Sequence, residues 1–394
     1  MQYDFETSPT RKEEGSLKWK QMYSWNENIP DDVVPLSVAD MEFLNPPEIT
    51  EGLSEFAKKV VYGYTGPTME YSEAVKSWMK NKHDFDIESD WIVNTSGVVT
   101  GFFTAVRAYT NVGDGVIIMT PVYYPFYNAV EKTGRKLVKN PLLNNNDYYE
   151  IDFENLDKLC QKEENKLIIF CSPHNPIGRV WKKEELEKLA EIAIRNNMII
   201  VSDEIHNDII MKGYKHTVLQ TLSEKIADRT ITCTAPSKTF NLAGLACSNI
   251  IIKNEMLREK YVKATQEVGS SIINIFGYEG CRLAYTKCEK WLEELLKVIE
   301  INRDLVVKFF EEKYPKITAN PIEGTYLQWV NFKALGMDKD SLEKFMHEKA
   351  FFITDEGYIF GEEGDGYERI NLAVPTKKLE ICLNYLDNAL KEIY

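Results

Sequence analysis

Five short, continuously apolar segments separated by longer amphipathic ones limit most strongly how this chain can fold. The apolar segments end in turn residues and lie at residues 115–121, 166–173, 198–204, 230–237 and 248–253. Such runs are typical of strands that are buried on both faces of a mostly parallel sheet. The segments between them show helical spacing, as in residues 182–197, where Leu186, Leu189, Ala190 and Ala193 share one face. Strand–helix alternation of this kind predicts an α/β layer fold, with ligands at the carboxyl ends of the strands.

Toward its two ends the chain shows a different pattern. Residues 284–313 have the spacing of one long helix, which leads into a C-terminal lobe of mixed strand and helix patterns. The N-terminal 45 residues are rich in Trp, Pro and Asp and are typical of an arm rather than a core element. We therefore expect an N-terminal arm at residues 1–45 that contributes to a small domain, a large domain at 46–285 and the smaller α+β domain itself at 286–394.

The net charge of the chain excludes several kinds of partner. Its 394 residues include 47 Lys and Arg against 61 Asp and Glu, which gives a formal net charge of −14. A nucleic-acid groove or a surface for anionic membranes needs clustered basic residues, so the expected partner is a small molecule. Hydrophobic residues make up 44% of the chain, which is enough to build a sizeable core.

The cysteines and the N-terminus indicate the compartment. Seven cysteines without a C-x-x-C pair show neither a disulfide framework nor zinc-ligand spacing, so we expect a reducing environment and no metal site. The first fifteen residues lack the apolar run of a signal peptide. No stretch of the sequence reaches the roughly 18 apolar residues of a membrane span. These features predict a soluble, cytoplasmic protein.

Lys238 is the residue with the most informative surroundings. It follows a buried apolar run directly and lies beside Ser237 and before small residues. Burying an unpaired lysine costs several kcal/mol of folding free energy. A lysine at such a position is therefore expected to have a chemical role. One such role is to form a Schiff base, in which a lysine of lowered pKa condenses with an aldehyde cofactor. The alternative is a surface lysine on a loop.

Upstream polar residues favour the first interpretation. Asp203 ends a predicted strand, where its carboxylate could hold a pyridine nitrogen protonated; the alternative is a helix N-cap. Asn175 lies between a strand and a turn and could donate its amide to a ring hydroxyl, although this dipeptide is also a common turn. His206 could approach the same hydroxyl, or it could be a structural histidine.

Residues 94–106 read as a glycine-containing turn that opens an apolar helix. The backbone amides of Gly97, Val98 and Val99 could bind a phosphate there through unpaired N–H groups and the helix dipole. Ordinary helix entry is the alternative. Tyr123 follows the next predicted strand and is suited to stacking on a planar ring, or to packing in the core.

Arg369 lies inside a strand-like run near the C-terminus. Its guanidinium suits bidentate capture of a carboxylate, although a structural ion pair is the default for an isolated arginine. Each of these patterns is weak alone. However, they lie at the ends of predicted strands and helices, and an α/β sheet binds its ligands at such ends.

Across essentially its whole length, the sequence resembles the pyridoxal 5'-phosphate enzymes of aminotransferase fold. Within them it is similar to the cystathionine β-lyase/C–S lyase branch of MalY/PatB type, and in particular to cystalysin-like L-cysteine desulfhydrases. The segments that carry the resemblance are GSLKWKQMYS, VVPLSVADMEF, GYTGPT, TPVYYPF, CSPHNPIGRVWKK, SDEIH, TAPSKTFNLAG, EGTYLQW and ERINLAVP. The resemblance implies a three-layer α/β/α large domain with a mostly parallel sheet, like that of aspartate aminotransferase, and a smaller α+β domain.

The resemblance also implies roles at the cofactor ring. Lys238 would form the Schiff base and Asp203 would pair with the pyridinium. Asn175 would contact the ring oxygen, and Tyr123 would stack on the ring. His206 takes the place where many relatives have a tyrosine near the ring hydroxyl.

Further roles concern the phosphate and the substrate. By resemblance, the amides of Val98 and Val99 with Ser237 would hold the phosphate, and Arg369 would hold the substrate α-carboxylate. Many aminotransferases have a phosphate-binding arginine eight residues after the lysine, and this chain has Ala246 there. The β-lyase branch tends to lack that arginine as well.

The resemblance implies a homodimer with shared active sites. Tyr64 would reach the phosphate of the neighbouring subunit. Ala39 and Tyr124 would contribute to the substrate pocket. The proton donor to the leaving sulfur is left open among Tyr64, Tyr123 and Tyr124.

Three functions follow, in order of preference. The first is α,β-elimination of L-cysteine, cystathionine or a related S-conjugate to a thiol or sulfide, pyruvate and ammonia. The second is a class I/II aminotransferase that uses the same lysine and aspartate. The third is a regulatory, protein-binding role that some members of this branch have.

Overall fold

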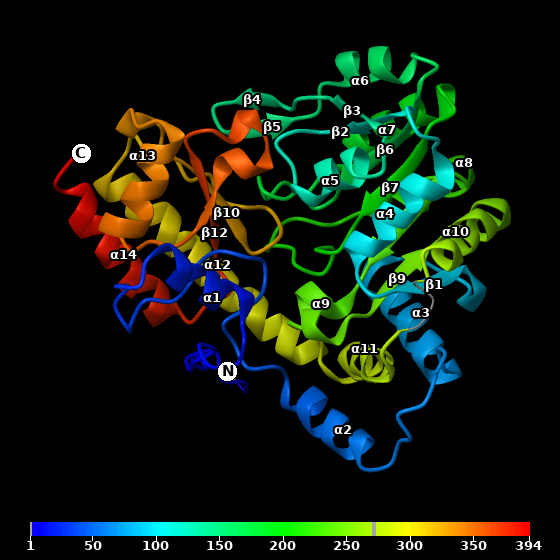
Figure 1. The fold of residues 1–394 in the computed structure, drawn as a ribbon, viewed down its shortest axis with the longest axis horizontal. Helices are drawn as coiled ribbons and strands as arrows, with labels where there is room; N and C mark the ends of the chain where they lie inside the picture. Colours follow the sequence, from blue (N-terminus) through cyan, green and yellow to red (C-terminus); the bar gives the residue numbers. More distant parts are fainter. Residues whose placement is uncertain (1, 270–272) are drawn as a thin grey trace.

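The computed structural model describes residues 2–269 and 273–394 of the chain and contains the predicted α/β layer architecture (Figure 1). The central sheet has seven strands in the order β1-β9-β8-β7-β6-β2-β3. Their bounds are β1 (Ile92–Thr95), β2 (Gly115–Ile118), β3 (Lys136–Lys139), β6 (Asn165–Cys171), β7 (Ile199–Asp203), β8 (Thr230–Thr234) and β9 (Ser248–Ile251). Only β9 runs antiparallel to its neighbours β1 and β8, so the prediction of a mostly parallel sheet is confirmed.

All five apolar segments form strands of this sheet, whereas β1 and β3 were not predicted. Both unpredicted strands lie at the sheet edges, and most of their residues are only partly buried. An edge strand packs fewer apolar neighbours, so its sequence lacks the continuous apolar run that marks β2, β6, β7, β8 and β9.

Helices cover both faces of the sheet because alternate strand residues point to opposite sides. In β2, Val116 and Ile118 pack with Phe102 of α4 (Val98–Tyr109) on one face. Ile117, between them, packs with Leu189 of α7 (Lys183–Arg195) on the other face. The remaining helices of the large lobe are α2 (Pro47–Ala57), α3 (Met69–His83), α5 (Pro125–Glu131), α6 (Phe153–Cys160), α8 (Glu224–Ala227), α9 (Pro236–Thr239) and α10 (Glu255–Glu267).

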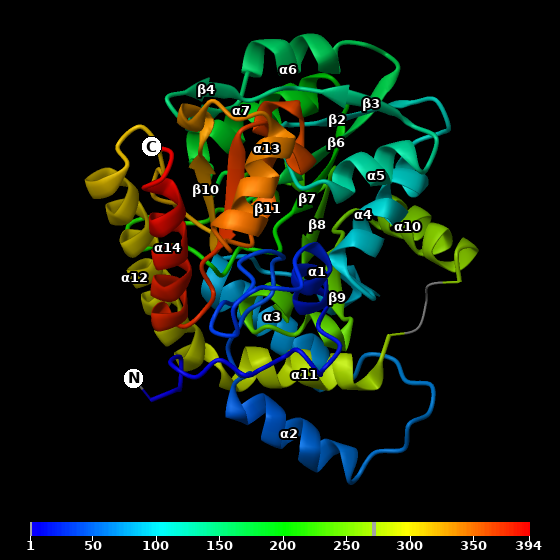
Figure 2. The same cartoon turned by 60° about the vertical axis from the view of Figure 1, so that its left-hand side comes forward.

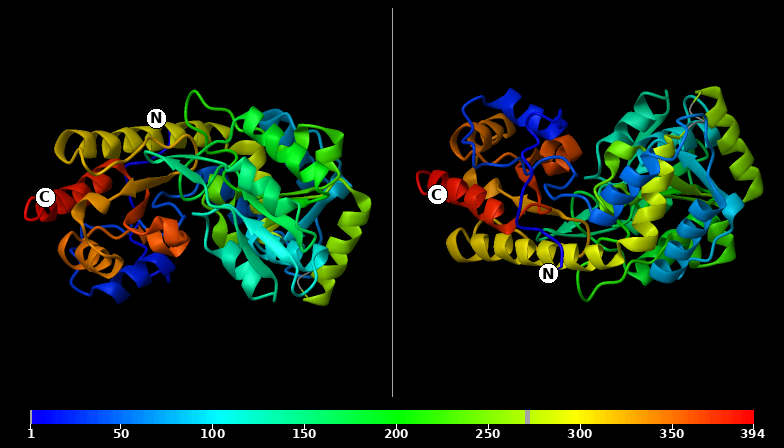
Figure 3. Two further views of the ribbon diagram at one scale, coloured as in Figure 1. Left: turned by 90° about the horizontal axis from the view of Figure 1, so that it is seen from above. Right: turned by 90° about the horizontal axis from the view of Figure 1, so that it is seen from below.

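The C-terminal lobe lies beside the large lobe, as the views from above and below show (Figure 3). Its sheet has the order β10-β12-β11, and a separate hairpin of β4 (Leu143–Asn145) and β5 (Tyr148–Glu150) belongs to the large lobe. The elements of the C-terminal lobe are β10 (Leu327–Asn331), β11 (Asp355–Glu356), β12 (Tyr367–Asn371), α13 (Lys339–Lys344), a π-helix (Phe345–Lys349) and α14 (Thr376–Leu390).

The long helix predicted at residues 284–313 is confirmed over Glu289–Lys313, but the first predicted residues belong to a separate helix. Two helices occupy this region, α11 (Ile275–Lys287) and α12 (Glu289–Lys313). Cys288 separates them with backbone angles of −108° and 15°, outside the helical range. Apolar periodicity continues across the break because α11 and the start of α12 pack on the same core, so hydropathy alone does not reveal the change of direction (Figure 2).

The N-terminal residues also contribute to the core, which the composition of this segment did not indicate. Helix α1 (Leu17–Trp25) buries Trp19 and Met22 in the same cluster as the C-terminal lobe. Further along, the backbone of Leu36 accepts from Asn371 N–H at 2.8 Å and donates to Ile353 O at 2.7 Å. The domain boundaries after residues 45 and 285 remain predictions. None of the described helices is long and apolar enough to cross a membrane.

Candidate active site

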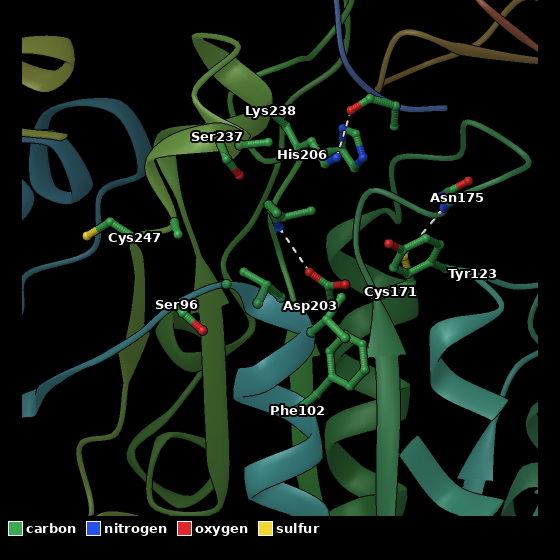
Figure 4. A pocket seen from close by; sticks show the side chains of 17 residues that line it. Ser96, Phe102, Tyr123, Cys171, Asn175, Asp203, His206, Ser237, Lys238 and Cys247 are labelled. Carbon is green, nitrogen blue, oxygen red and sulfur yellow. Dashed lines mark hydrogen bonds between the residues drawn. The ribbon is translucent and has the colours of Figure 1, made fainter. Parts of the chain in front are cut away.

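A cavity opens at the carboxyl ends of β6 and β7, between the first turn of α4 and helix α9. Its empty space, part of which is open to solvent, is about 780 Å³. Figure 4 shows Asp203 near its centre, Tyr123 and Asn175 to one side, and Ser96 and Ser237 to the other. Most of the predicted site residues line this cavity: Ala39, Val98, Val99, Tyr123, Asn175, Asp203, His206, Ser237 and Lys238.

Lys238 lies on α9, shortly after the end of β8, and part of its amine is neutral near pH 7. Its Nζ donates a hydrogen bond to Ala39 O at 2.7 Å. Burial lowers the pKa of Lys238 to about 8, against the opposing attraction of Asp40. At pH 7 roughly one-tenth of the amine is therefore neutral, whereas an unperturbed lysine would be almost wholly protonated. A buried lysine with a neutral fraction of this size can act as a nucleophile and as a base.

Asp203 ends β7 with a carboxylate that has no Lys or Arg within 4.0 Å among the described residues. Its Oδ1 accepts from Ile205 N–H at 3.3 Å. Burial raises the pKa of Asp203 to about 7. A cation beside this carboxylate would favour its ionised form, so the position fits a protonated ring nitrogen of a bound group.

His206 lies close to Lys238 and is held in its neutral form. Burial, with the charges of Lys238 and Arg369, lowers the pKa of His206 well below its usual value. Its ring meets that of Tyr326 edge-to-face at 5.5 Å. Its Nδ1 is buried and has no hydrogen-bond partner in the described part of the chain. A neutral imidazole with an unused nitrogen can exchange a hydrogen bond with a polar group bound in the cavity.

Arg369 lies on β12 of the C-terminal lobe and contacts Asn175, which lines the cavity. Its Nη1 donates to Asn175 Oδ1 at 2.9 Å, and its Nη2 donates to the carboxylate of Asp355. Its guanidinium also lies 4.7 Å from the ring centre of Phe360. Arg369 is therefore held behind Asn175 rather than on the cavity wall, and its Nε has no partner among the described residues. No sequence pattern indicated Asp355, because its two-residue strand contains no motif.

The first turn of α4 forms the opposite end of the cavity. The amides of Val98 and Val99 start the helix and have no backbone acceptor within the described residues. Ser96 and Ser237 add hydroxyl groups beside them. Lys238 is the one Lys or Arg among the described residues that line the cavity. An anion bound at this end would thus be stabilised by N–H groups, hydroxyls and the helix dipole.

Besides Arg369, two other predicted residues do not line the cavity. The Tyr64 side chain is 95% exposed and lies outside the site of its own chain. Tyr124 is 43% exposed and lies next to Tyr123, with ring centres 5.4 Å apart, but it does not line the cavity.

A buried charge network that the sequence did not reveal anchors the cavity wall around Ala39. Lys18 on α1 is fully buried and pairs with Asp40 and Glu42 at 3.0 and 3.1 Å. Arg11 pairs with the same two carboxylates, each at 3.0 Å. These contacts hold the segment whose Ala39 carbonyl accepts from Lys238. The basic partners lie some twenty to thirty positions upstream of the acids, without a spacing motif.

Comparison with known proteins places this arrangement in a family. The model of the family described as aminotransferase class I and II matches residues 31–386. The chain belongs to the aminotransferase class I and II family. The mostly parallel sheet with helices on both faces agrees with this membership.

Several members of the class I and II family are similar to this chain over most of its length. Cystathionine beta-lyase PatB of Bacillus subtilis is 39% identical, covering 91% of this chain and 93% of the relative. The crystal structure of cystalysin from Treponema denticola, which contains a pyridoxal 5'-phosphate cofactor, is 53% identical with a TM-score of 0.98 and full coverage of both chains. The PLP-bound C-S lyase from Staphylococcus hominis is 32% identical with a TM-score of 0.91, covering 99% and 98%.

Proposed function

We propose that this chain is a pyridoxal 5'-phosphate-dependent carbon–sulfur β-lyase that acts on L-cysteine, cystathionine or a related S-conjugate. The observation that carries the proposal is one cavity that joins three features: a lysine of lowered pKa, a buried carboxylate with no Lys or Arg within 4.0 Å among the described residues, and a helix start whose amides could bind an anion. The likeness to cystalysin, PatB and a C-S lyase supports the carbon–sulfur chemistry.

The residues of the cavity fit this cofactor. Lys238 would hold its aldehyde, and Asp203 would pair with its ring nitrogen. Tyr123 and Asn175 lie on the same side of the cavity, where Tyr123 would stack on the ring and Asn175 would contact its oxygen. Because Asn175 Oδ1 already accepts from Arg369, its Nδ2 is the group left to donate. His206 would lie near the same oxygen.

At the other end of the cavity, the amides of Val98 and Val99 with Ser237 would hold the phosphate. When bound, pyridoxal 5'-phosphate supplies an aldehyde that joins amines and a cationic ring that withdraws electrons from the substrate carbon.

The chain's own groups would handle the protons and the substrate. Lys238 Nζ would remove the proton from the α-carbon, since a large share of this amine is neutral near pH 8. Arg369, fixed by Asp355 and Asn175, would hold the α-carboxylate, and Ala39 and Tyr124 would bound the substrate. Burial raises the pKa of Tyr123, so its hydroxyl remains protonated and can donate to the leaving sulfur. Tyr64 of a second subunit is the other candidate donor.

A class I/II aminotransferase is the second candidate function. The observation that favours it is the family match itself, together with an aspartate aminotransferase of Pyrococcus horikoshii that is 27% identical over 92% of this chain. The same lysine and aspartate would serve both reactions, so the two differ in the fate of the proton and of the sulfur. The regulatory, protein-binding alternative rests on the resemblance alone.

Incubation of the holoenzyme with L-cysteine or cystathionine as the only substrate should release pyruvate, together with sulfide or a thiol. Elimination needs no amino-group acceptor, so adding a 2-oxo acid should leave the rate unchanged. Pyruvate is measured with lactate dehydrogenase, and sulfide is measured colorimetrically. Turnover that begins only after a 2-oxo acid is added would contradict the lyase and favour transamination.

We further propose that the active unit is a homodimer in the cytoplasm. The segment after α2 and the start of α3 expose Val61, Tyr62, Tyr64 and Met69 at 84, 67, 95 and 74%. Clustered exposed apolar side chains of this kind are typical of an interface. The seven cysteines are all buried free thiols, as expected in a reducing compartment. Cell fractionation tests the compartment.

A mixing experiment tests whether Tyr64 serves the neighbouring site. Tyr64→Ala and Lys238→Ala chains are each expected to be nearly inactive as pure dimers. Unfolding and refolding them together at equal amounts should restore about one-quarter of wild-type activity, because half of the dimers are hybrids with one intact site each. If Tyr64 acted within its own chain, the mixture would stay as inactive as the two parents.

A further inference from the structure

The two strands that hold Arg369 carry a second set of polar side chains on their other face. In the β11/β12 pair, Asp355 is opposite Arg369, and Glu356 is opposite Glu368. Successive strand residues point to opposite faces. Arg369, which contacts Asn175, therefore shares one face of the strands with Asp355, whereas Glu356 and Glu368 lie on the opposite face.

On that outer face, Glu356 meets two residues of the neighbouring helical segment. Glu343 of α13 and His347 of the π-helix each bring one ligand atom near Glu356, and the three atoms lie within 4.8 Å of one another. His347 and Glu356 are 5% and 7% exposed, and Glu343 is partly exposed. The cluster is thus buried on one side and reachable from solvent on the other.

One oxygen of this cluster is buried and unused. Glu356 Oε1 has no hydrogen-bond partner among the described residues. His347 Nε2 lies 3.2 Å from it, but not in hydrogen-bonding alignment. Two ligands of one tetrahedral ion, each about 2.0–2.1 Å from the metal, are about 3.3 Å apart. The nitrogen and the oxygen therefore have the spacing of two ligands that share an ion.

The charges around the cluster favour a cation. Within the part of the chain that the structure describes, no Lys or Arg pairs with Glu343, Glu356 or Glu368. Glu368 is buried and accepts only from Thr354 Oγ1, at 2.6 Å. Three carboxylates thus share this region with a single imidazole. Buried carboxylates without a cation are costly, and a divalent ion would remove much of that cost.

The N-terminal helix holds the imidazole in place. Trp25 of α1 stacks on the His347 ring, with centres 4.4 Å apart and planes 10° apart. Asn26 Nδ2 donates to His347 O at 2.9 Å. On the acidic side, Tyr358 donates its hydroxyl to Glu343 Oε2 at 2.9 Å, which leaves Oε1 free. Contacts that orient a ligand in this way are a usual part of metal sites.

We propose that Glu343, His347 and Glu356 bind a divalent first-row transition metal ion, with Zn²⁺ as the best fit to one imidazole and two carboxylates. A water molecule or Glu368 would complete the coordination. The sequence predicted no metal site. Glu343 and His347 are four positions apart on one helical segment, but no pattern in the sequence joins them to Glu356. Bound there, the ion would tie the helical segment to β11 and so support the strands that position Asp355 and Arg369.

Equilibrium dialysis of the holoenzyme against ZnCl2, after treatment with EDTA, tests the site. We expect one Zn²⁺ to bind saturably per protomer, and Mg²⁺ not to compete. Glu356→Gln and His347→Gln should each raise the Kd for Zn²⁺ about 100-fold, the loss expected when a ligand is removed. The matched control is Glu348→Gln, an exposed neighbour of His347 that pairs with Lys344 and should bind Zn²⁺ as the wild type does.

Two further measurements distinguish loss of the metal site from loss of the fold. Glu343→Gln changes a partly exposed side chain, so it should fold normally and still lose Zn²⁺ affinity. Zn²⁺ should raise the Tm of the wild type and of Glu348→Gln but not that of the three ligand variants, because a ligand stabilises only the state that binds it. No saturable Zn²⁺ in the wild type, or unchanged binding in well-folded Glu343→Gln and Glu356→Gln, would overturn the proposal.

Discussion

Lys238→Ala is expected to abolish release of pyruvate from L-cysteine, with a fall in kcat of at least about 10⁴-fold. The substitution removes the amine that would hold the cofactor and the base that would take the α-proton, and base catalysis alone contributes 10²- to 10⁴-fold. The variant should also lack the visible absorbance band of lysine-bound cofactor. Pyruvate release and the absorbance spectrum measure the two effects independently.

Lys162→Ala is the matched control for this substitution. Lys162 is exposed on the surface of the large lobe, so its loss should leave both the rate and the spectrum unchanged. Wild-type turnover by Lys238→Ala, or cofactor that stays attached to it after borohydride reduction and denaturation, would show that another group does the chemistry.

The pH dependence of cofactor uptake should report the same lysine in the wild-type apoenzyme. The neutral amine is the reactive form, and its pKa is lowered to about 8. Uptake should therefore be roughly one-tenth of its maximum rate at pH 7, reach half near pH 8 and level off above pH 9. Lys238→Ala should show no such rise.

Asp203→Asn is expected to lower kcat about 10³-fold while the protein still holds the cofactor. The amide has nearly the same shape as the carboxylate but no charge, so it cannot keep the ring nitrogen cationic. Loss of one well-placed electrostatic partner commonly costs 10²- to 10³-fold, and here the ring's electron withdrawal depends on it. Cofactor content, measured as bound phosphate, should match the wild type. An Asp203→Asn enzyme with wild-type kcat would refute the proposed ion pair.

Stability of the two apoproteins separates this effect from unfolding. Burial raises the pKa of Asp203 to about 7, from a model-peptide value of 3.8. Between about pH 4 and pH 7 the folded protein holds a proton on this acid that the unfolded chain has lost. The free energy of unfolding therefore falls as the pH rises through this range. The Asp203→Asn apoprotein has no such loss, so at pH 8 its Tm should equal or exceed that of the wild type. A lower Tm at pH 8 would instead point to damage to the fold.

Local sequence patterns predicted the central sheet and most of the cavity. Continuous apolar runs mark β2, β6, β7, β8 and β9 because both faces of these strands are covered by helices. Asp203 ends β7, and Asn175 and Lys238 follow the ends of β6 and β8 within a few residues; in a parallel sheet these carboxyl ends meet at one edge. Adjacency to a strand end was thus enough to bring these side chains together.

Contacts between distant segments were not predictable in the same way. Arg369 was expected to bind a substrate carboxylate, but its fixation by Asp355 and Asn175 depends on how two lobes meet. The network of Lys18 with Asp40 and Glu42 joins segments without a motif. The break at Cys288 was hidden as well, because both helices continue the same apolar periodicity.

The sequence alone determined which residues lie at strand ends and which family pattern they follow, because both depend on local order along the chain. It also determined that positive groups must be placed individually in a chain with a net charge of −14. Only the tertiary structure decided that burial lowers the pKa of Lys238 and raises the pKa of Asp203. It likewise brought His347 and Glu356 together on the outer face of the strands that carry Arg369. These properties depend on which distant segments pack together and exclude water, and no local pattern encodes that packing.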